Sequence, residues 1–254
     1  MKLAFFIEVQ LVPPNAQAKL STDLTLTVQA YSILYVSIAV HPDDRTARAR
    51  IRDAALYCFA RDGFSTPLRV IAERAEVSVP LITHHYGTKD TLRETCDDWV
   101  LERFLEMKLG AIAQPSTVKQ TLADTSGASV LTVYIVRSFL DATSSASRFF
   151  ERYVERLRQI IDSARQADML NPSPDEEERL HLLATQSIGS MMVEFVLNPP
   201  ANPSNFVDQV FTARNMAAYI DLYSHAFFKP SPAMDTYSQS IQERGQASTE
   251  SPSD

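Results

Sequence analysis

Closely spaced helix-end signals between residues 63 and 89 constrain the fold of this chain most strongly. Gly63, Thr66-Pro67, Ser78 and Gly87-Thr88 mark these ends. Glycine favours the left-handed residue that ends a helix, Ser and Thr cap helix starts, and Pro is tolerated in a first turn. The spacing therefore predicts three short helices, over 43–61, 67–75 and 79–86, and a fourth that begins at Lys89.

The remainder of the sequence also favours helix. The chain has 254 residues but only 6 glycines, and its long stretches without Gly or Pro are rich in Ala, Leu, Arg and Glu, which have high helix propensity. We therefore predict an all-α protein. Breaks at Pro, Gly and Asn divide the rest of the chain into expected helices over 89–113, 116–123, 128–142, 146–169, 175–197 and 205–227.

The second and third predicted helices have the pattern of a helix-turn-helix, in which small or apolar side chains fill the junction between two short helices. The junction residues would be Val70, Ile71, Ala75, Val77, Leu81 and Ile82. The side chains left facing outward near the start of the third helix are Val79, Pro80, Thr83 and His84. This is where a recognition helix meets base edges in the major groove of DNA.

The net charge of −7 is unfavourable for a DNA-binding protein, because phosphate contacts require Lys and Arg. The charge is unevenly distributed, however. Residues 41–95 carry 9 Lys and Arg against 8 Asp and Glu, a net +1, whereas residues 96–254 carry 13 against 21, a net −8. This asymmetry suits a small nucleic-acid-binding module joined to a larger part with another role.

The segment Arg50–Leu92 resembles the N-terminal DNA-binding domain of the TetR/AcrR family of regulators. The shared features are Ala54-Ala55, Phe59, Gly63-Phe64, Ile71-Ala72, Val77-Ser78, His85-Tyr86 and Lys89. The resemblance implies a three-helix helix-turn-helix domain over 41–92 and a larger helical ligand-binding and dimerisation domain over 93–229. It also implies a homodimer, double-stranded DNA as a partner, a small-molecule effector and no cofactor.

The resemblance further implies a set of DNA contacts: Arg69, Val79, Pro80, Thr83, His84, His85, Tyr86, Thr88 and Lys89. Arg69 is expected to reach a phosphate or the groove. Lys89 and the N–H groups that Thr88 caps are the expected phosphate site at the start of the fourth helix, because charge and helix dipole both favour an anion there.

The base-facing candidates are Val79, Thr83 and His84. A valine suits a thymine methyl group, and the hydroxyl and imidazole suit a base edge or a phosphate. Of His85 and Tyr86, the family implies that one packs inside the domain while the other reaches a phosphate.

Three residues depart from the family pattern. Thr83 stands where a tyrosine is common, and Pro67 replaces a Ser or Thr whose hydroxyl often reaches phosphate. Glu76 stands in the turn where Gly is common, which requires either a left-handed residue or a different turn. These departures leave the fold intact but lower the expected DNA affinity.

The second domain is expected to hold an apolar effector pocket. Aromatic and Met side chains recur through its helices, and as a set they could line a cavity; the candidates are Phe104, Met107, Tyr134, Phe139, Phe150, Tyr153, Met191 and Phe195. The last two helices would pair with those of a second copy. The candidates for this interface are Met192, Phe195, Val196, Phe211 and Tyr219.

The leading hypothesis is a homodimeric regulator, expected to be a repressor, that binds a palindromic operator and is released by a small apolar molecule. One alternative is a helical small-molecule-binding or interaction protein whose N-terminal domain binds DNA weakly. Another is a helical metalloenzyme built on the ExxH pair Glu178 and His181. Since a second ExxH, a phosphate-binding Gly-rich loop and a GxSxG elbow are all missing from the sequence, we expect neither an enzyme nor a metal site.

The two ends of the chain do not fit this pattern. Residues 1–40 are an extension whose apolar runs are too short for a cleavable signal or a membrane span. Residues 230–254 are rich in Ser, Pro, Gln and Glu, so we expect a disordered tail.

Cys58 and Cys96 lie in helical patterns without zinc-ligand spacing, and we interpret them as core thiols of a cytoplasmic protein without a membrane partner.

Overall fold

The computed structural model describes residues 47–114, 125–141 and 144–224, and six positions between 231 and 240. Within these residues the chain is helical and has no strand, as the sequence predicts. The extension over 1–40 and the expected helix over 116–123 lie outside the described residues.

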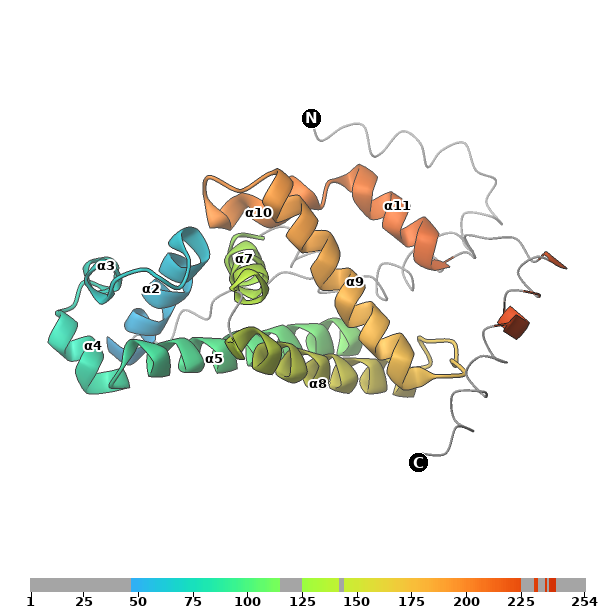
Figure 1. The fold of residues 1–254 in the computed structure, drawn as a ribbon, viewed down its shortest axis with the longest axis horizontal. Coiled ribbons are helices and arrows are strands. Elements are labelled where there is room, and N and C mark those ends of the chain that lie inside the picture. The colour runs from blue at the N-terminus through green and yellow to red at the C-terminus, as the bar shows by residue number, and fades with distance from the viewer. Residues whose placement is uncertain are drawn as a thin grey trace, which may run out of the picture.

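Three short helices form one end of the molecule (Figure 1). They are α2 (Ala47–Asp62), α3 (Leu68–Ala75) and α4 (Val79–Tyr86), and we call them the head. Helix α5 (Lys89–Ala113) starts beside α4 and runs out of the head into the rest of the protein. The boundary expected at 92/93 therefore falls inside one continuous helix, and α5 joins the two parts without a linker.

The body surrounds the far part of α5. It contains α7 (Ser126–Leu140), α8 (Ser144–Gln166), α9 (Glu176–Leu197), the short η4 (Pro203–Asn205) and α10 (Phe206–Val210), and α11 (Ala213–Ser224). Helix α8 lies along α5, while α7 stands between the head and the remainder of the body (Figure 1). Asp175 caps α9 by accepting the Glu178 N–H at 2.9 Å, as the expected boundary there requires.

Two predicted helix boundaries need correction. The sequence predicts Thr66 as the cap of α3, but Pro67 occupies that position, and the Thr66 hydroxyl donates to the Gly63 carbonyl oxygen at 2.7 Å. Thr66 therefore stabilises the turn and not the helix start. The helix predicted over 205–227 is interrupted at Phe211, between the end of α10 and the start of α11. Close to the start of α11, Thr212 Oγ1 accepts the Asn215 N–H at 3.3 Å.

Six positions of the expected tail are described, and the prediction of disorder for 230–254 stays a prediction. Residues 232, 236 and 238–240 are helical. The Thr236 hydroxyl donates to the Pro232 carbonyl oxygen and the Ser240 hydroxyl to that of Thr236, each at 2.9 Å. These bonds between residues four apart are typical of a helix.

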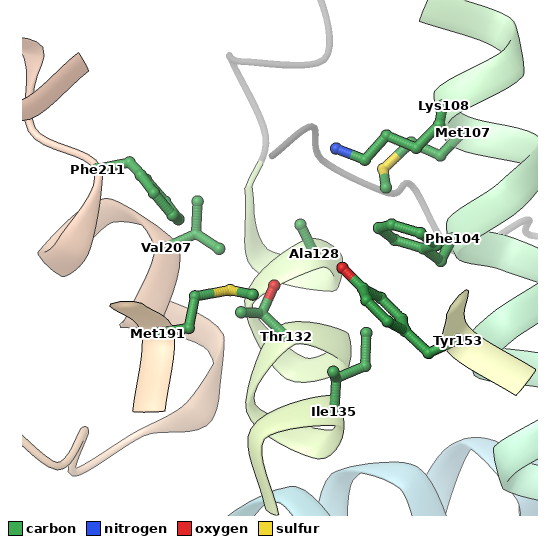
Figure 2. A pocket seen from close by; sticks show the side chains of 10 residues that line it. All are labelled: Phe104, Met107, Lys108, Ala128, Thr132, Ile135, Tyr153, Met191, Val207 and Phe211. Atoms are coloured by element: carbon green, nitrogen blue, oxygen red, sulfur yellow. The ribbon is translucent and has the colours of Figure 1, made fainter. Parts of the chain in front are cut away.

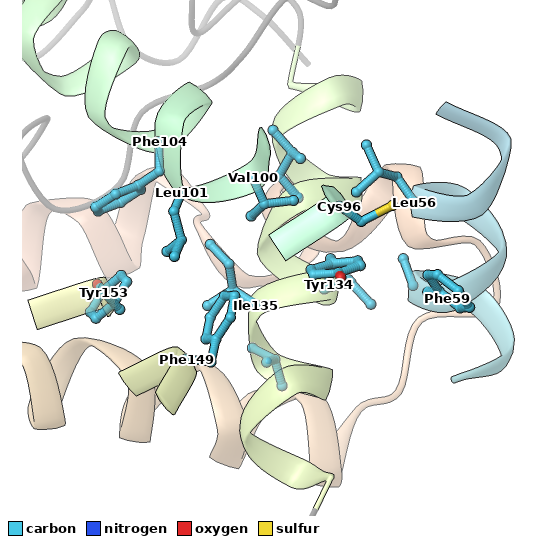
Figure 3. Packing of buried hydrophobic residues seen from close by; sticks show 14 of the residues in the cluster. Leu56, Phe59, Cys96, Val100, Leu101, Phe104, Tyr134, Ile135, Phe149 and Tyr153 are labelled. Carbon is cyan, nitrogen blue, oxygen red and sulfur yellow. The ribbon is translucent and has the colours of Figure 1, made fainter. Parts of the chain in front are cut away.

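One continuous core joins the head to the body (Figure 3). Phe64, which follows the left-handed Gly63, packs on Phe59 of α2 and edge-on against Tyr134 of α7, with ring centroids 5.3 Å apart in both cases. Cys58 and Cys96 are free and buried in the same core, as expected. The head is therefore packed directly on α7.

Candidate nucleic-acid interface and effector cavity

The turn between α3 and α4 uses a left-handed non-glycine residue. Glu76 has φ 54° and ψ 47°, and its N–H donates to the carbonyl oxygens of Ala72 and Glu73. The Val77 N–H donates to the same Ala72 oxygen at 3.0 Å. Of the two turn geometries that the sequence leaves open, the structure has the left-handed residue, which carries a conformational cost for glutamate.

The start of α4 presents an exposed face. Val79 is 36% exposed, and Pro80, Thr83 and His84 are exposed as well. The Thr83 hydroxyl lies 3.4 Å from the Val79 carbonyl oxygen, within its own helix. Arg69, in the first turn of α3, is exposed too. The outward positions predicted from spacing are therefore outward in the structure, with a short side chain at Thr83.

Tyr86 does not belong to this exposed face. Its ring is 5% exposed, and its hydroxyl donates to the Arg48 carbonyl oxygen at 2.6 Å. His85 is half-buried, with its ring 5.3 Å from that of His84. Tyr86 is thus the packing member of the His85-Tyr86 pair, which corrects its place among the expected DNA contacts.

The predicted phosphate site lies at the start of α5. Thr88 Oγ1 accepts the Thr91 N–H at 3.1 Å and shares a hydrogen bond of 2.9 Å with the Thr91 hydroxyl. Lys89 is the first residue of the helix, and partial burial lowers the pKa of its ammonium group. Cation and helix dipole therefore coincide at one point next to the end of α4.

Sequence reasoning missed two cations at the start of α2. Arg48 and Arg50 are exposed, and the Arg48 guanidinium lies 5.5 Å from the centroid of the Tyr86 ring. The stacking brings positive charge close to the C-terminal end of α4. The repeated arginines over 45–52 were the available signal.

A small, partly open cavity lies between α5, α7, α8, α9 and α10 (Figure 2). Its volume is about 30 Å³, enough for about two water molecules. The lining residues are Phe104, Met107, Lys108, Ala128, Thr132, Ile135, Tyr153, Met191, Val207 and Phe211. Four of the predicted pocket residues are among them: Phe104, Met107, Tyr153 and Met191.

The other four predicted pocket residues pack elsewhere. Tyr134 faces the head, and Phe139 lies against the Phe149, Phe150 and Tyr153 rings. Phe150 is edge-on to His181, and Phe195 to Phe206. The sequence identifies these residues as apolar helix positions, but periodicity does not tell a cavity wall from the core behind it.

Helix α7 connects the cavity to the head. Thr132 and Ile135 line the cavity, and Arg137 lies on the same helix. Arg137 Nε donates to the Ala60 carbonyl oxygen at 2.5 Å, and Nη2 to that of Arg61 at 2.7 Å. Because these carbonyls end α2, a side chain of the body provides hydrogen bonds that helix ends otherwise lack.

A buried carboxyl group reinforces this junction. Asp97 of α5 accepts the Tyr134 hydroxyl proton at 2.5 Å, and burial raises the pKa of both groups. Nearby, the Arg93 guanidinium is paired with Asp141 at 2.6 Å and stacks on Phe64, 3.7 Å from the ring centroid. The joint between head and body is therefore polar and closely fitted.

Helix α9 carries an exposed apolar stripe on the side away from the core. Leu182, Gln186, Gly189, Val193 and Val196 follow one another at intervals of four and three residues. Val193 is 56% exposed and Val196 64%. An added Cβ on Gly189 would meet nothing within 4 Å. Such spacing is that of a helix-packing seam.

The apolar composition of α9 has a second consequence. Among the described residues it is the helix long and apolar enough to cross a membrane, with a mean hydropathy of 1.3. One face packs on the body through Ala184, Ile188 and Met191, and the opposite face carries the exposed stripe. Two apolar faces on one helix account for this hydropathy.

Glu178 and His181 are both exposed on α9, and His181 packs on Phe150. In the part of the chain that the structure describes, no three His, Cys, Asp or Glu side chains are grouped as metal ligands would be. The ExxH pair therefore has no third ligand around it there.

The head is thus a helix-turn-helix DNA-binding domain attached to a helical body with a cavity. Residues 51–96 match the bacterial regulatory proteins of the tetR family, and residues 128–229 match the C-terminal domain of tetracyclin repressor-like proteins. The HTH-type transcriptional regulatory protein RaaS of Mycobacterium tuberculosis is 30% identical over 200 residues, covering 78% of this chain and 88% of that protein. The chain belongs to the tetR family and is a DNA-binding transcriptional regulator.

The solved structures to which the chain is similar are more distant in sequence. A candidate fatty acid metabolism regulator of Clostridium perfringens is 16% identical, with a TM-score of 0.42, over 68% of this chain and 97% of that one. A TetR-family regulator of Streptomyces coelicolor is 20% identical, with a TM-score of 0.23, over 72% of this chain and 99% of that one. The family assignment rests on the sequence matches.

Proposed function

We propose that the protein is a homodimeric repressor that binds a palindromic operator and leaves it when a small molecule occupies the cavity of the body. The observation that carries this proposal is the double role of α7, which lines the cavity and hydrogen-bonds the end of α2 through Arg137. A ligand that enlarges the cavity would move this helix and, with it, the head.

The proposed DNA contact uses the exposed start of α4 and the start of α5. Val79, Thr83 and His84 would face base edges, while Arg69 and Lys89 would hold phosphates on either side. Arg48 would add a phosphate contact that the sequence alone did not suggest. The exposure of these side chains and the net charge of +1 over residues 41–95 support the assignment.

The proposed dimer uses the stripe on α9 together with α11, whose Leu222 and Tyr223 are 46% and 45% exposed. Tyr223 lies 3.5 Å from Gln186 of α9, so the two helices present one surface. The earlier interface candidates change accordingly. Val196 stays, and Met192 and Tyr219 are half-buried candidates. Phe195 and Phe211 face inward.

A two-fold dimer presents two identical recognition helices, which matches a palindromic operator. Release follows only if the ligand binds the arrangement that does not fit DNA more tightly than the one that does. The ligand therefore acts by changing the distance or angle between the two heads.

The test is a footprint on the DNA upstream of the protein's own gene, repeated with Lys89→Ala. We expect a symmetric protected site. In the variant, the slope of log affinity against log salt should fall by about 2, since each lost phosphate contact contributes about 0.9 and the dimer loses two. Arg165→Ala, which removes an exposed cation of α8 far from the head, is the matched control.

The same experiment tests the alternative of an interaction protein with a weak head. Pro67 offers no hydroxyl, and the Thr83 hydroxyl is directed to its own helix. Binding of equal strength to operator and random DNA, with no protected site, would favour that alternative and contradict the repressor.

A further inference from the structure

The end of α4 and the start of α2 meet at the side chain of Tyr86, next to the start of α5 (Figure 1). The Tyr86 hydroxyl donates to the carbonyl oxygen of Arg48, in the first turn of α2, at 2.6 Å. The Arg48 guanidinium lies over the same ring, 5.5 Å from its centroid. One buried side chain therefore contacts both the backbone and the side chain of Arg48.

These two contacts act on different parts of Arg48. The hydrogen bond fixes the start of α2 relative to the end of α4, and burial raises the pKa of the Tyr86 hydroxyl, so it remains a donor at neutral pH. The ring attracts the guanidinium through its negative face. A long arginine side chain has many rotamers, and stacking restricts them before any partner binds.

The place of this contact is suited to the phosphate backbone of DNA. Helix α4 has eight residues, which correspond to about 12 Å, close to the width of the major groove. If the start of α4 faces base edges, its end lies towards the edge of the groove, where a backbone runs. Lys89 lies three residues beyond Tyr86 and Arg48 lies on its ring, so two cations adjoin this end of the helix.

We propose that Tyr86 is a positioning residue for DNA binding, which holds Arg48 against a backbone phosphate at the edge of the groove that α4 reads. This inference rests on the proposed DNA contact of the head and adds a residue that does not itself touch DNA. Because the tyrosine orders Arg48 in advance, less conformational entropy is lost when the phosphate is bound.

Arg50 provides a matched comparison within the same turn of α2. It is exposed, as Arg48 is. Successive residues of a helix are about 100° apart, so Arg50 lies about 200° around the helix from Arg48. Among the described residues the cation over the Tyr86 ring is that of Arg48. Replacing either arginine by alanine removes the same charge, but only one replacement removes the contact with Tyr86.

The experiment measures binding of the full chain to the duplex that the footprint protects and to a random-sequence duplex of equal length, by fluorescence anisotropy at several salt concentrations. Arg48→Ala should weaken binding to both duplexes by the same factor, at least about tenfold, because a phosphate contact is independent of sequence. The slope of log affinity against log salt should fall by about 2 for the dimer. Arg50→Ala should leave the slope unchanged.

Tyr86→Phe tests the positioning role, since it keeps the ring and removes the hydroxyl. We expect binding to both duplexes to weaken about threefold, with no further loss when the change is added to Arg48→Ala, because the hydroxyl acts through that residue. Arg48→Lys should keep the slope but bind more weakly than wild type, since an ammonium group stacks less well on a ring. A tyrosine that only stabilised the fold would weaken binding equally in the wild type and in Arg48→Ala.

An unchanged slope in Arg48→Ala, an equal loss in Arg50→Ala, or additive losses from Tyr86→Phe and Arg48→Ala would overturn the proposal. The footprint and its response to Lys89→Ala test the proposed function separately, because neither depends on Arg48. A protected site together with any of these three results would contradict the role of Tyr86 alone. Failure of the wild-type protein to bind either duplex would overturn both proposals.

Discussion

The head and the body of this protein are specified in different ways. In the head, several helix ends coincide with residues suited to them, such as Gly63, Gly87 and Thr88, and the exposed face of α4 follows from spacing within eight residues. In the body, five helices each contribute to the cavity, and residues as distant as Phe104 and Phe211 meet there.

The proposed DNA-binding surface of the head therefore depends on short-range contacts, whereas the shape of the cavity in the body depends on long-range ones. Val79 and Lys89 lie at the starts of α4 and α5, so local helix geometry fixes their place within the head. The cavity wall depends on side chains from elements that pack through long-range contacts, so it changes when those elements move. The two regions meet at α7 and α2, where Arg137 hydrogen-bonds the Ala60 carbonyl oxygen and the Tyr134 ring lies near that of Phe59.

The largest effect is expected from the surface of the body. Val193→Glu places a carboxylate at the centre of the stripe on α9, and its burial in both copies should cost about 3–5 kcal/mol of association free energy. We expect a monomer by sedimentation velocity, together with loss of operator binding although the head is unchanged. Ala167→Glu, an exposed substitution after α8, is the control. A stable Val193→Glu dimer would mean that the copies meet elsewhere.

The second-largest effect is expected on the unfolding free energy, at the junction between the head and the body. Arg137→Ala removes two charge-assisted hydrogen bonds to the end of α2 and the contact with Phe195. We expect a loss of about 2–3 kcal/mol in unfolding free energy, measured by chemical denaturation. Arg61→Ala, which breaks an exposed ion pair with Asp62, should cost at most about 0.5 kcal/mol. Similar losses in both variants would show that head and body are not joined through Arg137.

A smaller effect of opposite sign is expected within the head. Glu76→Gly relieves the left-handed backbone of the turn between α3 and α4, and should raise the unfolding free energy by about 1 kcal/mol. Glu76→Ala keeps the Cβ atom and should give no such gain. If alanine stabilised the protein as much as glycine, the cause would be the lost charge and not the backbone conformation.

The smallest effect depends on pH. Burial raises the pKa of Asp97 in the folded protein above its value in the unfolded chain. The protonated Asp97 carboxyl therefore contributes to the unfolding free energy at low pH. This contribution is lost as the pH rises through the pKa of Asp97 in the unfolded chain and then through its pKa in the folded protein. Asp97→Asn removes this dependence, so its stability relative to wild type should be greater at pH 7 than at pH 4. Asp98→Asn, at an exposed neighbour, should lack that pattern, and an Asp97→Asn difference independent of pH would refute the assignment.

Much of the head was predictable from sequence. The cap at Thr88 and the helix ends at Gly63 and Gly87 lie where spacing placed them, because capping depends on residues only a few positions apart. Ser78 takes the predicted position before α4, but its side chain makes no capping hydrogen bond. Thr66 was the exception. Its hydroxyl bonds backward to Gly63, a choice between two nearby partners that the sequence leaves open.

The body was predictable only as a set of helices. Periodicity identified Tyr134, Phe139, Phe150 and Phe195 as inward residues, but whether an inward residue meets a cavity, the core or the head depends on how the helices cross. The break at Phe211 and the burial of Lys108 were missed for the same reason, since each depends on neighbours far away in the chain.

The sequence by itself determined the helix-turn-helix, its outward residues and the family, because these follow from contacts within about forty residues. The tertiary structure alone decided that Tyr86 packs inward, that Arg137 hydrogen-bonds the end of α2, and that a buried ammonium group borders the cavity. Those features arise where distant segments meet, and local propensity carries no information about which segments will do so.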